Sequence, residues 1–317
     1  MNESSNSQTG LLSRPSLCAA SAFVLLATAG LWLSSLAAGL FSAGPEAMWA
    51  IENALYYLPF VALPMALYAR RHRGLSGAMR LNPLPVMSVL TLGLLGLLSV
   101  YIASAMAAVW GALLDGIGLH SPAGVAVPGD ERALALSILT MAALPAVCEE
   151  LLFRGFVLAA WETRGTYFAI GVSSALFALL HGNLYGLPVY LLVGGIAGFV
   201  TFATGSVYAG MVYHTVYNAA CLVIPYLMGQ GQGDGAELFL DAARVISLAL
   251  QTLMMLGLTG VALATLWLRG RNQPDIGALP RARTPLEAGE RLWLAAAVLA
   301  MIGTTAILLV LSGGGAA

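Results

Sequence analysis

Apolar residues along the chain fall into long runs, separated by shorter segments that are rich in Gly, Pro and charged residues. Nine such runs lie near residues 17–41, 48–69, 84–114, 132–160, 166–182, 184–203, 206–228, 243–268 and 292–312. An α-helix of about 20 residues, rising about 1.5 Å per residue, crosses about 30 Å of hydrocarbon. The pattern therefore predicts an all-α polytopic membrane protein, a bundle of about eight or nine transmembrane helices.

The composition agrees with this pattern. Of the 317 residues, 59% are hydrophobic and only 9% are charged, whereas soluble domains have roughly 25% charged residues. The first apolar run is too long for a signal-peptide core and lacks a clear A-x-A cleavage site, so we expect a retained first span. Cys18, Cys148 and Cys221 all lie inside predicted spans, which favours packing roles over a disulfide framework or a paired-cysteine metal site.

The arginines indicate an orientation. If the N-terminus is cytoplasmic, most arginines lie on the cytoplasmic side or approach it from within a span, and the exceptions are Arg132 and Arg244. Cytoplasmic loops of membrane proteins carry such an excess of basic residues. We therefore expect an integral protein of the bacterial cytoplasmic (inner) membrane with a cytoplasmic N-terminus. The basic loops could bind anionic lipid headgroups, although orientation alone accounts for them.

No connection between the runs is long enough for a soluble domain of its own. We divide the chain into N-terminal helices at 1–131 (about three), a core at 132–228 (about four) and C-terminal helices at 229–317 (about two). Two stretches of small residues, "GGIAG" at 194–198 and "GLTG" at 257–260, are expected to let helices approach closely.

Few ionisable side chains lie within the predicted spans. Each costs about 2.5–3.5 kcal/mol to insert, so each needs a partner or a function. Together with one asparagine they are Glu149, Glu150 and Arg154 on the fourth span, His181 at the end of the fifth, and His214 with Asn218 on the seventh. Glu52 and Asn53 are interpreted as interfacial, with a supporting polar contact as the alternative. Met211, Tyr213 and Tyr217 are interpreted as packing or lipid-facing, with substrate selection as the alternative.

Helical spacing separates the two glutamates. Glu150 and Arg154 are four residues apart on one helix face, so they are expected to form an ion pair. Glu149 lies about 100° away around the helix and is left free to face His181. Glu149 and His181 each lie 16 residues from Gly165 in the intervening turn, which places them at the same level in an antiparallel helical hairpin.

Two further pairs have the same four-residue spacing, Phe177 with His181 and His214 with Asn218. Counting along the seventh span places His214 somewhat shallower than Glu149, and a tilt of the helix could close the gap. Pro145, one turn before Glu149, removes a backbone hydrogen bond and is expected to kink the helix, which would open room beside the carboxylate.

This constellation suits peptide-bond hydrolysis. Glu149 and His181 could share a water, remove a proton from it and pass that proton to a leaving amine. His214 and Asn218 could donate hydrogen bonds to the oxyanion of the tetrahedral intermediate. Alternatively Glu149, His181 and His214 could bind Zn²⁺, because a catalytic zinc site needs three such ligands and an open position. The helical H-E-x-x-H motif is absent, and the residues leave both mechanisms open.

The strings "EELLFR" (149–154), "FALLH" (177–181) and "HTVYN" (214–218) resemble the EExxxR, FxxxH and HxxxN motifs of the CPBP intramembrane proteases. That family includes the type II CAAX prenyl endopeptidases and the bacterial Abi-type proteins. The resemblance covers 132–228, about a third of the chain. It implies a polar catalytic cavity inside the bilayer, catalytic roles for Glu149, Glu150, His181, His214 and Asn218, and supporting roles for Arg154 and Phe177.

The resemblance also sets the expected cofactor and partners. The family has been described both as zinc-dependent and as glutamate-dependent, so the cofactor is either Zn²⁺ or none. The expected partners are membrane lipids and a membrane-associated peptide or protein, with lipidated and CAAX-like substrates as candidate classes, and no nucleic acid. The alternative is a non-catalytic membrane protein, either a proton-coupled transporter that uses Glu and His as a relay or a bacteriocin-immunity or scaffold protein.

Overall fold

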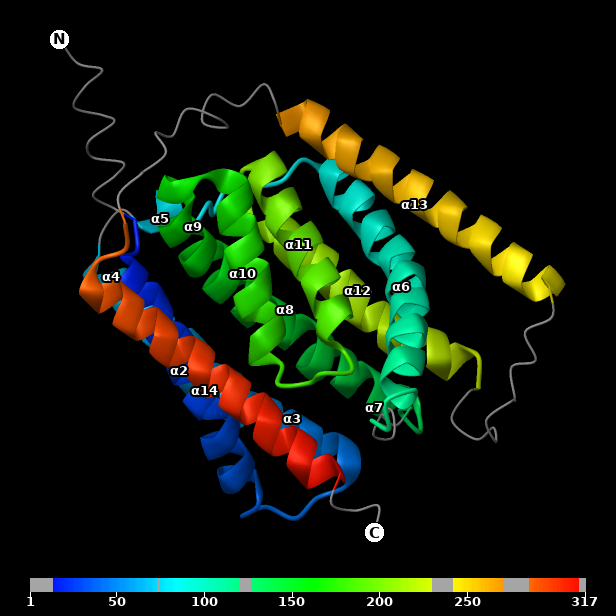
Figure 1. The fold of residues 1–317 in the computed structure, drawn as a ribbon, viewed down its shortest axis with the longest axis horizontal. Coiled ribbons are helices and arrows are strands. Elements are labelled where there is room, and N and C mark those ends of the chain that lie inside the picture. Colours follow the sequence, from blue (N-terminus) through cyan, green and yellow to red (C-terminus); the bar gives the residue numbers. More distant parts are fainter. Residues whose placement is uncertain (1–13, 73–74, 120–126, 230–241, 271–284, 314–317) are drawn as a thin grey trace.

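The computed structural model describes residues 14–72, 75–119, 127–229, 242–270 and 285–313, and every regular element in these ranges is a helix (Figure 1). Seven α-helices without π-helical turns have at least 15 residues: α2 (Leu17–Ala38), α6 (Val86–Asp115), α10 (Thr166–Leu180), α11 (Leu187–Thr204), α12 (Val207–Leu227), α13 (Ala242–Gly270) and α14 (Ala288–Gly313). A single helical turn, α5 (Leu75–Ala78), precedes α6.

Two further long helices contain π-helical turns. The first consists of α3 (Pro45–Tyr57), a π segment at Leu58–Ala62 and α4 (Leu63–Arg71). The second consists of α7 (Glu131–Ser137), a π segment at Ile138–Ala143, α8 (Leu144–Glu150), a second π segment at Leu151–Val157, α9 (Leu158–Trp161) and a 3₁₀ turn at Glu162–Arg164.

Pro145 lies in the first turn of α8, directly after a π segment. Proline has no backbone N–H, and its ring crowds the preceding turn of an α-helix. The wider π turn accommodates this without ending the helix, and such turns are frequent at functional sites. A second π segment begins directly after Glu150, so the adjacent glutamates lie between two stretches of altered helical geometry.

Eight helices in the described residues are long and apolar enough to cross a membrane, with Pro45–Arg71 and Glu131–Arg164 each counted as continuous. All nine predicted runs contain a helix, which confirms the predicted polytopic bundle. The fifth run forms α10, which has 15 residues and is only about 22 Å long. It ends where Gly182 adopts a positive φ of 60°, a backbone conformation that favours glycine.

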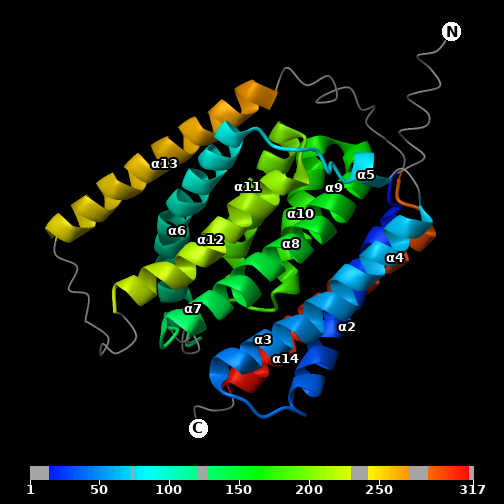
Figure 2. The same ribbon diagram turned by 180° about the vertical axis from the view of Figure 1, so that it is seen from behind.

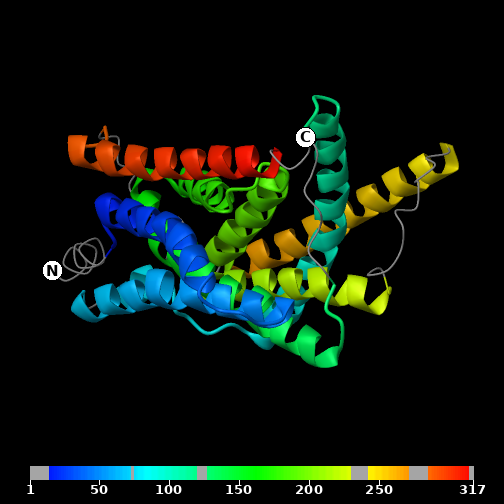
Figure 3. The same cartoon turned by 90° about the horizontal axis from the view of Figure 1, so that it is seen from below.

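The helices from α7 to α12 form the centre of the molecule. Helices α2, α3, α4 and α14 lie along one side of them, and α6 with α13 along the other (Figures 1 and 2). Seen from below, α14 runs beside α2 (Figure 3), and the indole N–H of Trp32 donates to the hydroxyl of Thr304 at 3.0 Å. Segments from the two ends of the chain therefore pack together.

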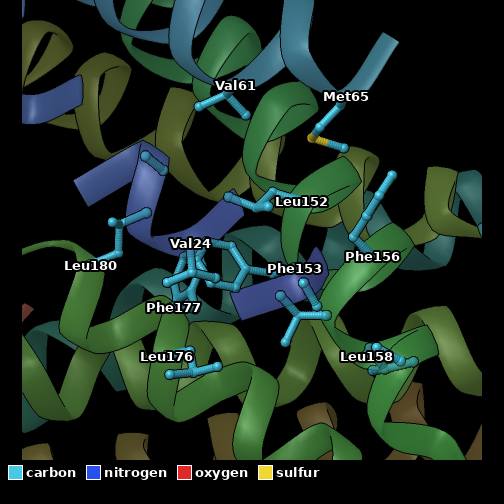
Figure 4. Close-up of a cluster of buried hydrophobic side chains, with 14 of the residues drawn as sticks. Val24, Val61, Met65, Leu152, Phe153, Phe156, Leu158, Leu176, Phe177 and Leu180 are labelled. Carbon is cyan, nitrogen blue, oxygen red and sulfur yellow. The ribbon is translucent and has the colours of Figure 1, made fainter. Parts of the chain in front are cut away.

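Buried apolar side chains form two clusters on either side of the centre. The larger joins α2, α3 and α4 to the π segment Leu151–Val157, α9 and α10. It includes Val24, Phe153, Phe156 and Phe177 (Figure 4). The smaller joins α6, α11, α12 and α13. The helix that carries Glu149 and Glu150 is thus packed against the N-terminal helices, not only against its neighbours in sequence.

Small residues bring α11 close to α10, as the sequence predicted for "GGIAG". A Cβ on Gly194 would lie 3.2 Å from the Cα of Ser174, and one on Gly198 would lie 3.1 Å from Ile170. The same expectation for "GLTG" was wrong, because a Cβ on Gly257 or Gly260 would meet no atom of the described residues within 4 Å.

Candidate active site

A cavity of about 200 Å³ lies among α3, α8, α10, α11 and α12. Its walls combine polar and aromatic side chains: Asn53, Tyr57, Met141, Pro145, Glu149, Phe177, His181, Tyr190, Val193, His214, Tyr217 and Asn218. Five of the predicted site residues are among them. The other two, Glu150 and Arg154, are fully buried behind this wall at 0% exposure.

Glu150 and Arg154 form the predicted ion pair. Arg154 Nη1 donates to Glu150 Oε1 at 3.0 Å, and Arg154 Nη2 donates to the backbone carbonyl of Gly194 on α11 at 2.7 Å. In low dielectric a charge is tolerated when it is paired and hydrogen-bonded. The pair therefore stabilises both charges and connects the helix that carries Glu149 and Glu150 to α11.

His214 lies between the two glutamates. Its Nδ1 is 3.0 Å from Glu150 Oε1, and its Nε2 is 4.0 Å from Glu149 Oε2. Because Glu150 Oε1 also accepts a hydrogen bond from Arg154, it acts as an acceptor towards His214, and Nδ1 carries the hydrogen. The distance of 4.0 Å is too long for a direct hydrogen bond. It is short enough for one water oxygen to lie within hydrogen-bonding distance of both atoms.

His181 follows the last residue of α10 and is fixed by its own helix and by α11. Its Nδ1 lies 2.8 Å from the carbonyl oxygen of Phe177. A carbonyl only accepts, so Nδ1 carries the hydrogen and Nε2 is the ring nitrogen available to a group in the cavity. The ring of Tyr190 stacks on the imidazole with centroids 4.0 Å apart. The tautomer and the ring plane of His181 are thus both set by contacts.

Phe177 connects the charged pair to the histidines. The guanidinium of Arg154 lies over its ring at 4.7 Å, and its centroid is 4.7 Å from that of His181 and 5.6 Å from that of His214. A cation over an aromatic face is attracted by the ring quadrupole. The predicted supporting role of Phe177 has a physical basis in these contacts.

Sequence reasoning assigned no role to Tyr57 or Tyr190, and it read Asn53 as interfacial and Tyr217 as packing or lipid-facing. All four side chains line the cavity, and the Tyr57 hydroxyl donates a hydrogen bond to Glu149 Oε1. One signal was present, because Asn53 and Tyr57 are four residues apart in an apolar run and so share a helix face. Nothing in the local sequence indicated that this face meets Glu149.

Oε2, the other oxygen of the Glu150 carboxylate, is closely packed by neighbouring helices. Neither Glu150 Oε2 nor the buried Thr201 hydroxyl has a hydrogen-bond partner among the described residues. A Cβ on Gly210 of α12 would lie 2.5 Å from Glu150 Oε2 and 2.9 Å from Thr201 Oγ1. Only a glycine at 210 lets α12 approach this carboxylate so closely, and that approach places His214 one turn further along.

The predicted zinc ligands were Glu149, His181 and His214. In the part of the chain that the structure describes, no group of three His, Cys, Asp or Glu side chains is placed to hold a metal ion. His214 Nδ1 faces Glu150 and His181 Nδ1 faces a carbonyl, so Glu149 and the two Nε2 atoms are the donors that would hold zinc in that alternative.

Residues 131–220 match the family of type II CAAX prenyl endopeptidases described as Rce1-like. The matched segment runs from the first residue of α7 into α12 and contains all seven predicted site residues. It confirms the resemblance to the CPBP proteases on the helices that carry the three motifs. Searches with the chain found no significant match among curated proteins or among solved structures.

Proposed function

We propose that the protein hydrolyses a peptide bond of a membrane-associated substrate with Glu149 as the base, as the match of residues 131–220 to the Rce1-like type II CAAX prenyl endopeptidases supports. The observation that carries this proposal is the cavity where Glu149, His181, His214 and Asn218 meet among apolar helices. Charged and imidazole groups at such a place are expensive unless they have a function.

In the proposed reaction Glu149 Oε2 takes one proton from a water molecule, while His181 Nε2 accepts a hydrogen bond from the O–H that remains and so orients the water. The water oxygen attacks the carbonyl carbon of the scissile peptide bond and keeps this second hydrogen. The carbonyl oxygen becomes an oxyanion, which accepts a hydrogen bond from the Asn218 amide and, when His214 carries a hydrogen on both ring nitrogens, from its Nε2–H.

The intermediate then collapses and the C–N bond breaks. The bonding electron pair goes to the nitrogen, which takes the proton that Glu149 removed from water, so Glu149 is ionised again at the end. Glu150 keeps Nδ1 of His214 occupied and holds its ring in place, and Arg154 and Phe177 hold Glu150 and the two rings. In this proposal Glu149, His181, His214 and Asn218 contact the water or the substrate. The remaining predicted residues lie behind them and hold them in position.

We propose that substrates enter from the membrane, held there by a lipidated C-terminus of CAAX type or by an apolar transmembrane segment. We also propose that the protein lies in a bacterial cytoplasmic membrane with a cytoplasmic N-terminus. The eight apolar helices support an integral membrane location, and the arginine distribution supports the orientation.

The experiment uses the purified full chain in lipid vesicles. Two sets of peptides are offered, one farnesylated near a CAAX-like C-terminus and one anchored by an apolar transmembrane segment, and products are identified by mass spectrometry. Glu149→Gln is expected to lower the cleavage rate about 10²–10⁴-fold, the usual contribution of a general base. Glu52→Gln, the same change at an exposed position, is expected to cleave normally.

Equal cleavage by Glu149→Gln and the wild type would overturn the proposal. The scaffold or immunity alternative makes the opposite prediction in cells, where Glu149→Ala, His181→Ala and His214→Ala should then keep the wild-type phenotype. Comparison of new peptide termini in membranes that contain the wild type or Glu149→Gln would identify natural substrates.

A further inference from the structure

Tyr57 reaches the site from outside the segment that matches the protease family. It is the last residue of α3, directly before the π segment Leu58–Ala62, and the family match begins at residue 131. Its side chain is buried, with 6% exposed, and its hydroxyl bonds Glu149 Oε1. An ionised carboxylate only accepts hydrogen bonds, so Tyr57 is the donor.

This contact makes the two oxygens of Glu149 unequal. Oε1 is held by Tyr57, whereas Oε2 faces His214 Nε2 across 4.0 Å. We propose that Tyr57 is a positioning residue for hydrolysis, whose hydroxyl fixes the Glu149 carboxylate so that Oε2 is the oxygen that takes the proton from water. The inference rests on the proposed function of Glu149 as base, and it assigns part of the active site to the N-terminal helices.

The same hydrogen bond offsets part of the cost of burying the Glu149 carboxylate in an apolar surrounding. A carboxylate removed from water is stabilised by donors aimed at it, and hydrogen bonds to charged groups are the strong ones. Groups from several elements surround Glu149 in the cavity: Tyr57 on α3, His181 after α10, Tyr190 on α11 and His214 on α12. On its own helix, Glu150 and Arg154 are paired with each other behind the cavity wall. Removal of the Tyr57 hydroxyl leaves all the other groups in place.

Tyr56 provides a matched control. It is the preceding residue, its side chain is also 6% exposed, and its ring packs edge-on against Tyr57 with centroids 4.6 Å apart. Its hydroxyl, however, has no hydrogen-bond partner in the described residues. Tyr56→Phe and Tyr57→Phe therefore remove the same atom from the same buried pair, and only the second removes a bond to Glu149.

The test compares Tyr56→Phe, Tyr57→Phe and Glu149→Gln in vesicles. The substrate is whichever of the two peptide sets, farnesylated or transmembrane, the wild type cleaves. Tyr57→Phe is expected to lower kcat about ten- to a hundredfold, the value of a hydrogen bond to a charged group, with little change in KM. Tyr56→Phe should keep the wild-type kcat.

A second measurement does not need a substrate. Infrared difference spectra between each variant that contains Glu149 and its Glu149→Gln counterpart isolate the stretching bands of the Glu149 carboxylate. These bands are expected to shift in the Tyr57→Phe background, where Oε1 loses its hydrogen bond, and to keep the wild-type position in the Tyr56→Phe background. Equal band positions in the two backgrounds, or equal kcat values, would overturn the role of Tyr57. Full cleavage by Glu149→Gln would instead overturn the proposed function, so the two failures are distinguishable.

Discussion

His214 and Glu150 form a buried hydrogen bond, with Nδ1 3.0 Å from Oε1. Because this bond fixes one ring nitrogen, the other faces Oε2 of Glu149. Glu150 does not line the cavity itself. It acts on the cavity through the orientation of His214, and adjacent glutamates that point to different sides of one helix are linked through a single imidazole.

Loss of the arginine should destabilise the protein strongly. Arg154→Gln leaves the Glu150 carboxylate buried without its main partner, and we expect a loss of about 3–5 kcal/mol in the free energy of unfolding. Unfolding in detergent micelles would measure it. The double variant Glu150→Gln with Arg154→Gln contains no unpaired charge at these positions and should be more stable than Arg154→Gln alone. If the destabilisation of the double variant equals the sum of those of Glu150→Gln and Arg154→Gln, the two residues are not coupled.

A methyl group at position 210 should disturb the site. The Cβ of Gly210→Ala would lie 2.5 Å from Glu150 Oε2, so α12 must move away or the carboxylate must turn. We expect a destabilisation of about 1–3 kcal/mol, typical of overpacking, together with loss of cleavage. Gly195→Ala on α11 is the control, because its Cβ meets no described atom within 4 Å. Normal activity of Gly210→Ala would argue against the close approach.

The Asn218 amide should matter in the transition state. If it binds the oxyanion, Asn218→Ala lowers kcat about 10²–10³-fold with KM nearly unchanged. Asn53→Ala removes the other amide that lines the cavity, one that donates to the carbonyl of its own helix at Trp49, and a clearly smaller loss is expected. Steady-state kinetics on the same peptide distinguish the two, and equal losses would refute the assignment.

Chelation tests the choice between water activated by Glu149 and a zinc-bound water. The described residues hold no group of three His, Cys, Asp or Glu side chains placed to bind a metal ion. If Glu149 activates the water, as proposed, the protein keeps its cleavage rate after treatment with a strong chelator. Metal content measured on the same active sample is the control. Activity that is lost on chelation and restored by zinc would overturn the mechanism without a metal.

Much of the fold and part of the site followed from local pattern. The apolar runs predicted the helices because a bilayer requires long apolar segments whose backbone groups bond internally. Helical spacing alone predicted the Glu150–Arg154 pair, which the structure confirms. Equal counting from Gly165 placed Glu149 and His181 at one level, and both line the same cavity.

The contacts between distant helices did not follow in this way. Counting placed His214 somewhat shallower than Glu149 unless the helix tilts, and it gave no sign of the bond to Glu150, which exists because Gly210 allows α12 to approach closely. The contact of Tyr57 could not be predicted because it depends on which side of the helix that carries Glu149 packs against α3. The two π segments, which alter the rotation of residues around the helix, also have no simple sequence signal besides Pro145.

The contact between α2 and α14 has a consequence for biosynthesis. Membrane proteins are made from the N-terminus, so α2 enters the bilayer before any other described helix, while its neighbour α14 is made last among them. Until then the face of α2 that carries Trp32, which later bonds Thr304, is covered only by lipid or by a temporary partner. The side of the bundle nearest the N-terminal helices is therefore completed late, after the residues of the cavity have already been synthesised.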